Sequence, residues 1–267
     1  MKKHRSSQFL AICTAAVLAL SVPAWASQVS ITPLDTGNTT SSQSQSGASE
    51  PSTAQNTSGQ TVDISSITKP TVASQGAVLL NAADGSVLFS KNGDTTYYPA
   101  SITKLMTALL VAENCNLDDT VTFSATATTN LESGAVSIGM AEGDTMTVRQ
   151  CLYALLLKSA NEVGNALAEH VAGSNAAFAE KMNAKAASLG CTNTHFANPH
   201  GLNDPNHYTT PHDMALIARA AFANDIVKTV ASTRTYTLPA TKNNPSGLTV
   251  TMGHKMLNPN DARYYQG

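Results

Sequence analysis

Hydrophobic and polar residues follow three successive patterns along this chain. An apolar stretch from residue 9 to residue 20 comes after a basic start. Between residues 36 and 61, 19 of 26 residues are Ser, Thr, Gln or Asn, and none is aromatic or a branched aliphatic. From residue 72 onward, short apolar runs alternate with amphipathic, helix-like stretches. The three patterns predict an export signal, a polar linker and a folded domain.

The folded domain is predicted to start with a β-hairpin and a helix. Two apolar runs, at 76–80 and 86–90, are joined through a segment that ends in Asp84-Gly85, a strong hairpin signal. A helical pattern then runs from residue 102 to residue 114, with Leu105, Leu109 and Ala112 on one face.

Capping residues predict four further helices. Thr147 and Gln150 form a capping box that opens a helix, and this helix is expected to stop near residue 159. The other three helices are expected over 162–171, after a Ser174 cap, and after a Thr210 cap. Strand-like runs follow at 235–238 and 248–252. Strands at both ends of the domain with helices between them predict an α+β fold.

The N-terminal third carries targeting and spacing features rather than chemistry. Residues 1–26 resemble a secretory signal peptide, with a basic start, an apolar run and an Ala24-Trp25-Ala26 cleavage site. A lipoprotein is the weaker alternative, because Cys13 lies inside the apolar run and follows the bulky Ile12. Residues 27–71 are predicted to be a disordered linker, since they cannot bury enough apolar surface to offset the entropy of ordering. The folded domain is expected over 72–267.

Charge and cysteine content narrow the possible functions. The chain has 16 Lys and Arg against 18 Asp and Glu, a formal net charge of −2, which gives no basic surface for nucleic acid. Signal cleavage would remove Cys13 and leave Cys115, Cys151 and Cys191, an odd number. The last two are expected on apolar helix faces as buried free thiols.

Ser101 and Lys104 form the first candidate site. Residues three apart share one face of a helix, so the Lys104 amine can reach the Ser101 hydroxyl and accept its proton if burial keeps the amine neutral. At a helix start the Ser101 N–H is also free to stabilise an oxyanion. The same tetrapeptide occurs at 66–69, but Pro70 follows it and forbids a continuing helix. Only the second copy is therefore a credible site, with a helix cap at Ser101 as the alternative reading.

Ser159 and Asn161 form the second candidate site. They place a hydroxyl and an amide at the break between two apolar helices, where they could relay a proton and bind a substrate amide. A simple helix-breaking cap is the alternative, because a Ser-x-Asn motif alone carries little information.

Together these motifs resemble the low-molecular-mass penicillin-binding proteins, the serine-type D-Ala-D-Ala carboxypeptidases of peptidase family S11. The resemblance covers roughly residues 72–267 and is carried by the segments 99–108, 143–148, 152–163, 194–202 and 209–218. It implies a β-lactamase/transpeptidase-like fold, in which an antiparallel sheet and a helical lobe enclose the site. It also implies that no cofactor is needed.

The resemblance implies a role for each candidate residue. Ser101 would attack the D-Ala-D-Ala carbonyl and carry the acyl group, with Lys104 as the proton acceptor. Ser159 would pass the proton to the leaving D-alanine, and Asn161 would bind the substrate amide. Peptidoglycan stem peptides would be the substrates, and β-lactams would acylate the same serine.

The sequence departs from the family at its third motif. No Lys-Thr-Gly or Lys-Ser-Gly follows Ser159, and residues 254–267 resemble the stretch that leads up to this motif. We therefore expect a fragment of a longer protein whose C-terminal sheet strands are missing. A membrane anchor is expected only in the missing part.

Three alternative functions stay open at this stage. A serine β-lactamase would share both motifs but needs a deacylating base, for which the sequence offers no convincing candidate. A zinc hydrolase is suggested by four histidines at 195, 200, 207 and 212, but their spacing fits no compact ligand pair, so no metal site is predicted. A cell-wall-binding or regulatory relative without turnover is the third alternative.

Overall fold

The computed structural model describes residues 53–55, 61–63, 70–129, 131–257 and 263. The predicted signal peptide lies outside these residues. The chain divides into a main unit that includes residues 73–267 and a smaller unit that includes β1 (Thr53–Gln55) and β2 (Thr61–Asp63). These two strands pair antiparallel within the stretch for which the sequence predicts a disordered linker.

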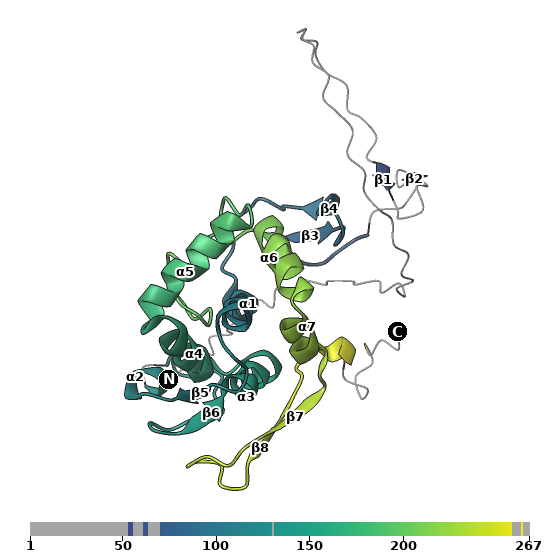
Figure 1. Cartoon of the computed structure of the whole chain (residues 1–267). Helices are drawn as coiled ribbons and strands as arrows, with labels where there is room; N and C mark the ends of the chain where they lie inside the picture. The colour runs from purple at the N-terminus through teal and green to yellow at the C-terminus, as the bar shows by residue number, and fades with distance from the viewer. Residues whose placement is uncertain (1–52, 56–60, 64–69, 130, 258–262, 264–267) are drawn as a thin grey trace, which may run out of the picture. The chain divides into compact units, whose positions relative to one another are not determined.

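The main unit contains helices and short antiparallel strand pairs (Figure 1), which confirms the α+β class. The described helices are η1 (Ala100–Thr103), α1 (Lys104–Asn114), α2 (Ala125–Thr128), α3 (Val148–Tyr153), the π-helix η2 (Ala154–Lys158), α4 (Asn161–Ala172), α5 (Asn175–Ser188), α6 (Pro211–Ala223), α7 (Asp225–Ser232) and η3 (Lys255–Leu257). The strands are β3 (Ala77–Leu80), β4 (Val87–Lys91), β5 (Thr120–Thr122), β6 (Thr145–Thr147), β7 (Thr235–Leu238) and β8 (Leu248–Thr251).

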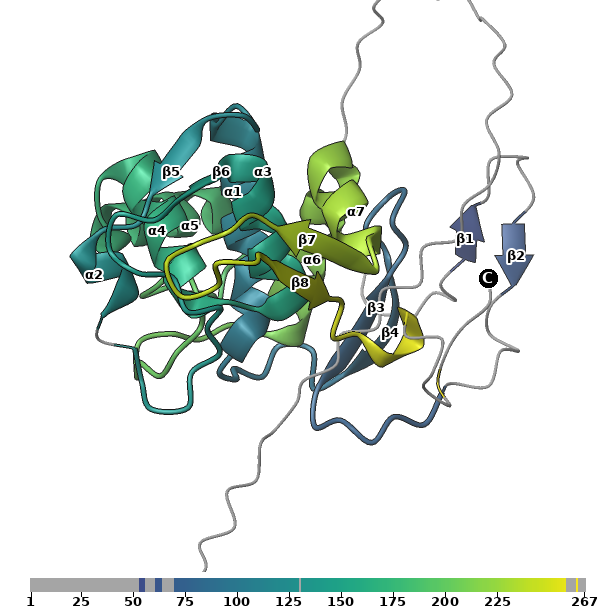
Figure 2. The same cartoon turned by 90° about the horizontal axis from the view of Figure 1, so that it is seen from below.

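The strands of the described residues form separate antiparallel pairs rather than one continuous sheet (Figure 2). The predicted hairpin is confirmed as β3–β4, in which Ala77 faces Lys91 and Leu79 faces Phe89. The two strand-like runs near the C-terminus pair as β7–β8. The pairing of β5 with β6 was not predicted, because each strand has only three residues and 22 residues separate them.

Helix α1 lies at the centre of the helical part, where α4, α5, α6 and α7 all contact it (Figure 1). Its apolar side chains are almost completely buried, as shown by Met106 at 0% and Leu109 at 1% exposure. Such a helix is fixed on several sides at once, and burial of each large apolar side chain stabilises the fold by about 2 kcal/mol. The residues at the start of α1 therefore stand on a rigid support.

The predicted caps are present at the helix starts. Thr147 and Gln150 form the full capping box of α3, and the Ser174 hydroxyl accepts from the Ala177 N–H at the start of α5. The Thr210 hydroxyl caps α6 by accepting from the Asp213 N–H. No helix among the described residues is both long and apolar enough to cross a membrane.

The described cysteines are free thiols. Cys151 is fully buried on α3, as predicted. The prediction for Cys191 is wrong in one respect, because this residue follows α5 instead of lying on a helix face, and it is only half-buried. Burial raises the pKa of the Cys191 thiol to about 12, so both thiols are held in the protonated form.

Candidate active site

Ser101 and Lys104 lie at the junction of η1 and α1, on one face of the helical segment. The Lys104 side chain is buried and only 2% exposed, whereas Ser101 is exposed. The Lys104 Nζ and Ser101 Oγ are 3.3 Å apart, within hydrogen-bond distance. The three-residue spacing thus brings the two groups together as predicted, because side chains at positions i and i+3 of a 3-10 turn lie one above the other.

The Lys104 amine has two further partners that fix its orientation. It donates to Asn161 Oδ1 at 2.8 Å and to the main-chain carbonyl of His200 at 2.7 Å. Both oxygens are pure acceptors, whereas the Ser101 hydroxyl can donate or accept. A neutral amine has two N–H bonds and one lone pair, so the two carbonyl oxygens take the N–H bonds. The lone pair then faces the Ser101 hydroxyl.

Burial makes the neutral amine accessible near neutral pH. The loss of water around Lys104 lowers its pKa from 10.5 to about 7, and the nearby Glu162 carboxylate opposes part of this shift. A base whose pKa lies near the working pH suits general-base catalysis, since a large share of it is unprotonated and still basic enough to take a proton.

The second motif lies where η2 ends and α4 begins. Ser159 adopts a left-handed conformation with φ 64°, which breaks the helix between Lys158 and Asn161. Asn161 is buried, and both its main-chain N–H and its Nδ2 donate to the Val136 carbonyl at 2.9 Å. Ser159 Oγ is buried and has no hydrogen-bond partner among the described residues. The structure therefore joins Ser101, Lys104 and Asn161 by hydrogen bonds, but it links Ser159 to none of them.

The segment 197–202 supports the start of α1. Its Pro199 carbonyl accepts from the Thr107 hydroxyl at 2.6 Å, one turn beyond Lys104. Gly201 has φ +86°, and a Cβ at this position would lie 1.8 Å from the carbonyl oxygen of Ala100. Only glycine allows the chain to approach so closely. Ala100 itself has φ 50°, a conformation that costs energy for a residue with a side chain.

His207 holds the same segment from the other side. Its Nδ1 accepts from the Ala197 N–H at 3.0 Å, so the proton of the neutral ring is on Nε2 and is donated to the Thr103 hydroxyl at 2.8 Å. Burial lowers the pKa of His207 to about 4. Burial, together with the Lys104 charge, lowers the pKa of His200 to about 3. Both rings are therefore neutral when the Lys104 amine titrates.

The other predicted histidines have structural contacts. His195 Nδ1 donates to the Asn206 carbonyl at 2.6 Å, and His212 lies in the first turn of α6. Within the described ranges, no group of three or more His, Cys, Asp or Glu side chains is placed to hold a metal ion.

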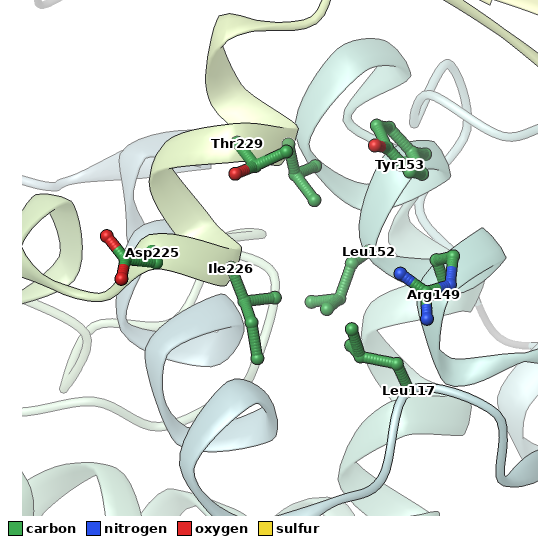
Figure 3. A pocket seen from close by; sticks show the side chains of 8 residues that line it. Leu117, Arg149, Leu152, Tyr153, Asp225, Ile226 and Thr229 are labelled. Atoms are coloured by element: carbon green, nitrogen blue, oxygen red, sulfur yellow. The ribbon is translucent and has the colours of Figure 1, made fainter.

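A separate apolar pocket opens between α3 and α7 (Figure 3). It has a volume of about 220 Å³, and Leu117, Leu152 and Ile226 point into it while Arg149 and Asp225 lie at its rim. None of the four candidate residues lines this pocket. The candidate chemistry therefore lies at the exposed start of α1, not in the pocket.

Three groups of this site were not identified as candidates from the sequence. Glu162 is next to Asn161, and Val136 and His200 contribute main-chain carbonyls, which have no side-chain signature. The only available signal was the family resemblance of the segment 194–202, which contains His200 but does not indicate which of its atoms is used.

Comparisons with known proteins agree with this geometry. A model of the D-alanyl-D-alanine carboxypeptidase family matches residues 63–265. The chain is 39% identical over 183 residues to a D-alanyl-D-alanine carboxypeptidase of Streptomyces sp. (strain K15), covering 64% of this chain and 62% of the relative. It is 38% identical over 150 residues to the carboxypeptidase DacF of Bacillus subtilis (strain 168), covering 54% of this chain and 38% of the relative. The matched part thus spans between 38% and 62% of these two relatives.

Solved structures show the same fold. A D-alanyl-D-alanine carboxypeptidase from Mycobacterium tuberculosis H37Rv superposes with a TM-score of 0.67 at 30% identity, over 76% of this chain and 73% of that one. The Streptomyces K15 DD-transpeptidase gives a TM-score of 0.66 at 34% identity, over 72% of this chain and 78% of that one. The predicted transpeptidase-like fold is confirmed by both.

Proposed function

Since the chain belongs to the D-alanyl-D-alanine carboxypeptidase family, we propose that it carries the acylating centre of a serine-type D-Ala-D-Ala carboxypeptidase. Its substrates would be peptidoglycan stem peptides that end in D-Ala-D-Ala, and β-lactams would be covalent inhibitors. One observation carries the proposal: a buried amine with a pKa of about 7 lies in hydrogen-bond contact with an exposed serine hydroxyl.

The first step forms an acyl-enzyme on Ser101. The neutral Lys104 amine takes the proton from the Ser101 hydroxyl as the Oγ atom bonds to the carbonyl carbon of the penultimate D-alanine. Asn161 Oδ1 and the His200 carbonyl hold the amine through the transfer and stabilise the ammonium that forms. The Ser101 N–H, at the N-terminal end of the helical segment, helps to hold the oxyanion.

The second step releases D-alanine. The bond between the carbonyl carbon and the leaving nitrogen breaks, and the proton on Lys104 returns to that nitrogen through the Ser159 hydroxyl. This hydroxyl suits a relay because it is buried and has no partner among the described residues. One N–H of the Asn161 amide is used by Val136, and the second is left to bind the substrate amide. Water then hydrolyses the ester and releases a stem peptide shortened by one residue.

The site of action is inferred to be outside the cytoplasm. The family acts on the cell wall, and residues 1–26 have the basic start, apolar run and small-residue cleavage site of a signal peptide. Expression of the full gene in a bacterial host, followed by N-terminal sequencing of the mature protein, tests this inference. A mature N-terminus at residue 27 supports export, and an intact Met1 in the cytoplasm contradicts it.

Labelling by a fluorescent penicillin tests the proposed function, with the complete product of the gene as the protein. Ser101→Ala should abolish the adduct. Ser66→Ala is the matched control, because residue 66 begins the same tetrapeptide outside the described residues, and it should leave labelling unchanged. Release of D-alanine from a peptide ending in D-Ala-D-Ala should be lost with the same variant. Labelling that survives Ser101→Ala, or rapid hydrolysis of penicillin without a lasting adduct, would refute the proposal.

A further inference from the structure

Glu162 is a buried carboxylate whose environment the proposed acylation steps do not explain. It is 1% exposed and lies in the first turn of α4, directly after Asn161. Its Oε1 accepts three hydrogen bonds, from the Ser137 hydroxyl at 2.6 Å and from the main-chain N–H groups of Ile138 and Gly139 at 2.7 and 3.1 Å. Its Oε2 is buried without a partner among the described residues. Burial of a carboxylate is costly, so its presence at this position calls for a reason.

The turn that Glu162 holds also carries the carbonyl that fixes Asn161. Val136 directly precedes Ser137, and its carbonyl accepts from both the main-chain N–H and the Nδ2 of Asn161. Glu162 and Asn161 thus clamp the segment 136–139 from adjacent positions of one helix. The other side of the Asn161 amide, its Oδ1, holds the Lys104 amine.

The opposite side of the same turn is also held. Asn244 Nδ2 donates to the Ile138 carbonyl at 2.9 Å, and Asn243 Nδ2 donates to the Gly139 carbonyl at 2.8 Å. Both asparagines lie in the connection between β7 and β8. The turn therefore has its N–H groups fixed by Glu162 and its carbonyls fixed by this connection, and Glu162 is the only one of these contacts that carries a charge.

We propose that Glu162 is a positioning residue of the acylating centre: it fixes the turn 136–139 so that Val136 orients Asn161, and Asn161 orients the Lys104 amine toward Ser101. This inference rests on the proposed function and adds to it a fourth group, which acts through Asn161 without touching the substrate. It also assigns the carboxylate a second effect, the electrostatic control of the protonation of Lys104.

The electrostatic effect has a definite sign. The Glu162 charge favours the ammonium form of Lys104 and so raises its pKa against the larger lowering by burial. The other ionisable group that interacts with Lys104 is His200, which is neutral in this range because its pKa is lowered to about 3. Loss of the Glu162 charge should therefore lower the pKa of Lys104 and move the acid side of the acylation profile to lower pH.

Two substitutions separate the clamp from the charge. Glu162→Gln keeps an oxygen that can accept from Ser137, Ile138 and Gly139 but removes the charge, whereas Glu162→Ala removes both. Glu169→Gln is the matched control, because Glu169 is on the same helix and accepts from the Thr126 hydroxyl at 2.6 Å in a different turn. The rate of acylation by a fluorescent penicillin is measured against pH for the wild type and the three variants.

We expect Glu162→Ala to lower the maximal rate by about 10- to 100-fold, the cost of a misplaced catalytic group. We expect Glu162→Gln to keep the maximal rate within about threefold and to shift the acid limb to lower pH, with Glu169→Gln unchanged in both respects. A wild-type maximum in Glu162→Ala, or an unmoved acid limb in Glu162→Gln, overturns the inference while labelling of the wild type leaves the proposed function intact.

A second measurement is independent of activity. NMR titration of the Lys104 side chain, labelled at its terminal carbon, reports the amine pKa in the wild type, in Glu162→Gln and in Glu169→Gln. A lower pKa in Glu162→Gln alone supports the inference even for a chain that fails to react with penicillin. The same pKa in all three proteins contradicts it.

Discussion

Replacement of Lys104 by methionine should flatten the pH dependence of the stability of the domain. The Lys104 amine is 2% exposed and has a pKa of about 7 in the folded protein, against 10.5 for a free lysine. Between these two values the unfolded chain binds a proton that the folded protein does not bind. Stability therefore rises with pH in this window and is lowest below pH 7, where the buried amine must be charged.

The magnitude follows from the size of the shift. A difference of 3.5 between 10.5 and about 7 corresponds to roughly 5 kcal/mol, because each pKa unit is worth about 1.4 kcal/mol. The free energy of unfolding of the wild type should rise by about 1 kcal/mol for each pH unit between pH 7.5 and 9.5 relative to Lys104→Met. The variant also leaves Asn161 Oδ1 and the His200 carbonyl without a donor, but this cost does not depend on pH.

Urea denaturation at several pH values measures this difference. Thiols and tyrosines titrate in the same range in both proteins, so they cancel when the two curves are subtracted. Lys228→Met controls for the loss of one positive charge, because Lys228 is exposed on α7. Parallel curves for the wild type and Lys104→Met would refute the reasoning, since the amine would then bind its proton equally in the folded and unfolded states.

Two further substitutions test the support of the site. Gly201→Ala forces a Cβ to 1.8 Å from the Ala100 carbonyl, so acylation should fall by about 100-fold or more, as measured by penicillin labelling; an unchanged rate would show that the close approach is not needed. His207→Leu leaves the Thr103 hydroxyl and the Ala197 N–H without their partner and should lower the free energy of unfolding by about 2–4 kcal/mol at pH 7. The neutral form of His207 is favoured by folding, since burial lowers its pKa to about 4, so the wild type should lose more stability than this variant on acidification from pH 6.5 to 4; equal losses would contradict that assignment.

The sequence predicted the groups whose position depends on local geometry. The distance between Ser101 and Lys104 follows from a three-residue spacing at a helix start, and the caps at Thr147, Ser174 and Thr210 follow from the chemistry of side chains near free N–H groups. The hairpin β3–β4 follows from two apolar runs around Asp84-Gly85.

The remaining features depend on contacts between distant segments. The His200 carbonyl reaches Lys104 across 96 positions of the sequence, and any residue could supply such an oxygen. The pairing of β5 with β6 involves three residues on each side, too few for a periodic signal. Glu162 gave no pattern of its own, because its three donors come from a turn more than 20 residues earlier.

The role of Asn161 shows the limit of a prediction made from one motif. The sequence suggests that this amide binds the substrate, whereas the structure shows its Oδ1 on the Lys104 amine and one Nδ2 hydrogen on the Val136 carbonyl. Substrate binding stays a prediction for the second Nδ2 hydrogen. Orientation of the base is a role that only the tertiary contacts reveal.

Peptide mapping by mass spectrometry after reaction with benzylpenicillin tests the central claim most directly. Proteolysis of the labelled protein should yield one modified peptide, carrying the intact penicilloyl group on Ser101. Its rate of formation should rise with pH through about 7, where the Lys104 amine loses its proton. A penicilloyl group on any other residue, or an unmodified Ser101 after complete reaction, would contradict the assignment of Ser101 as the nucleophile.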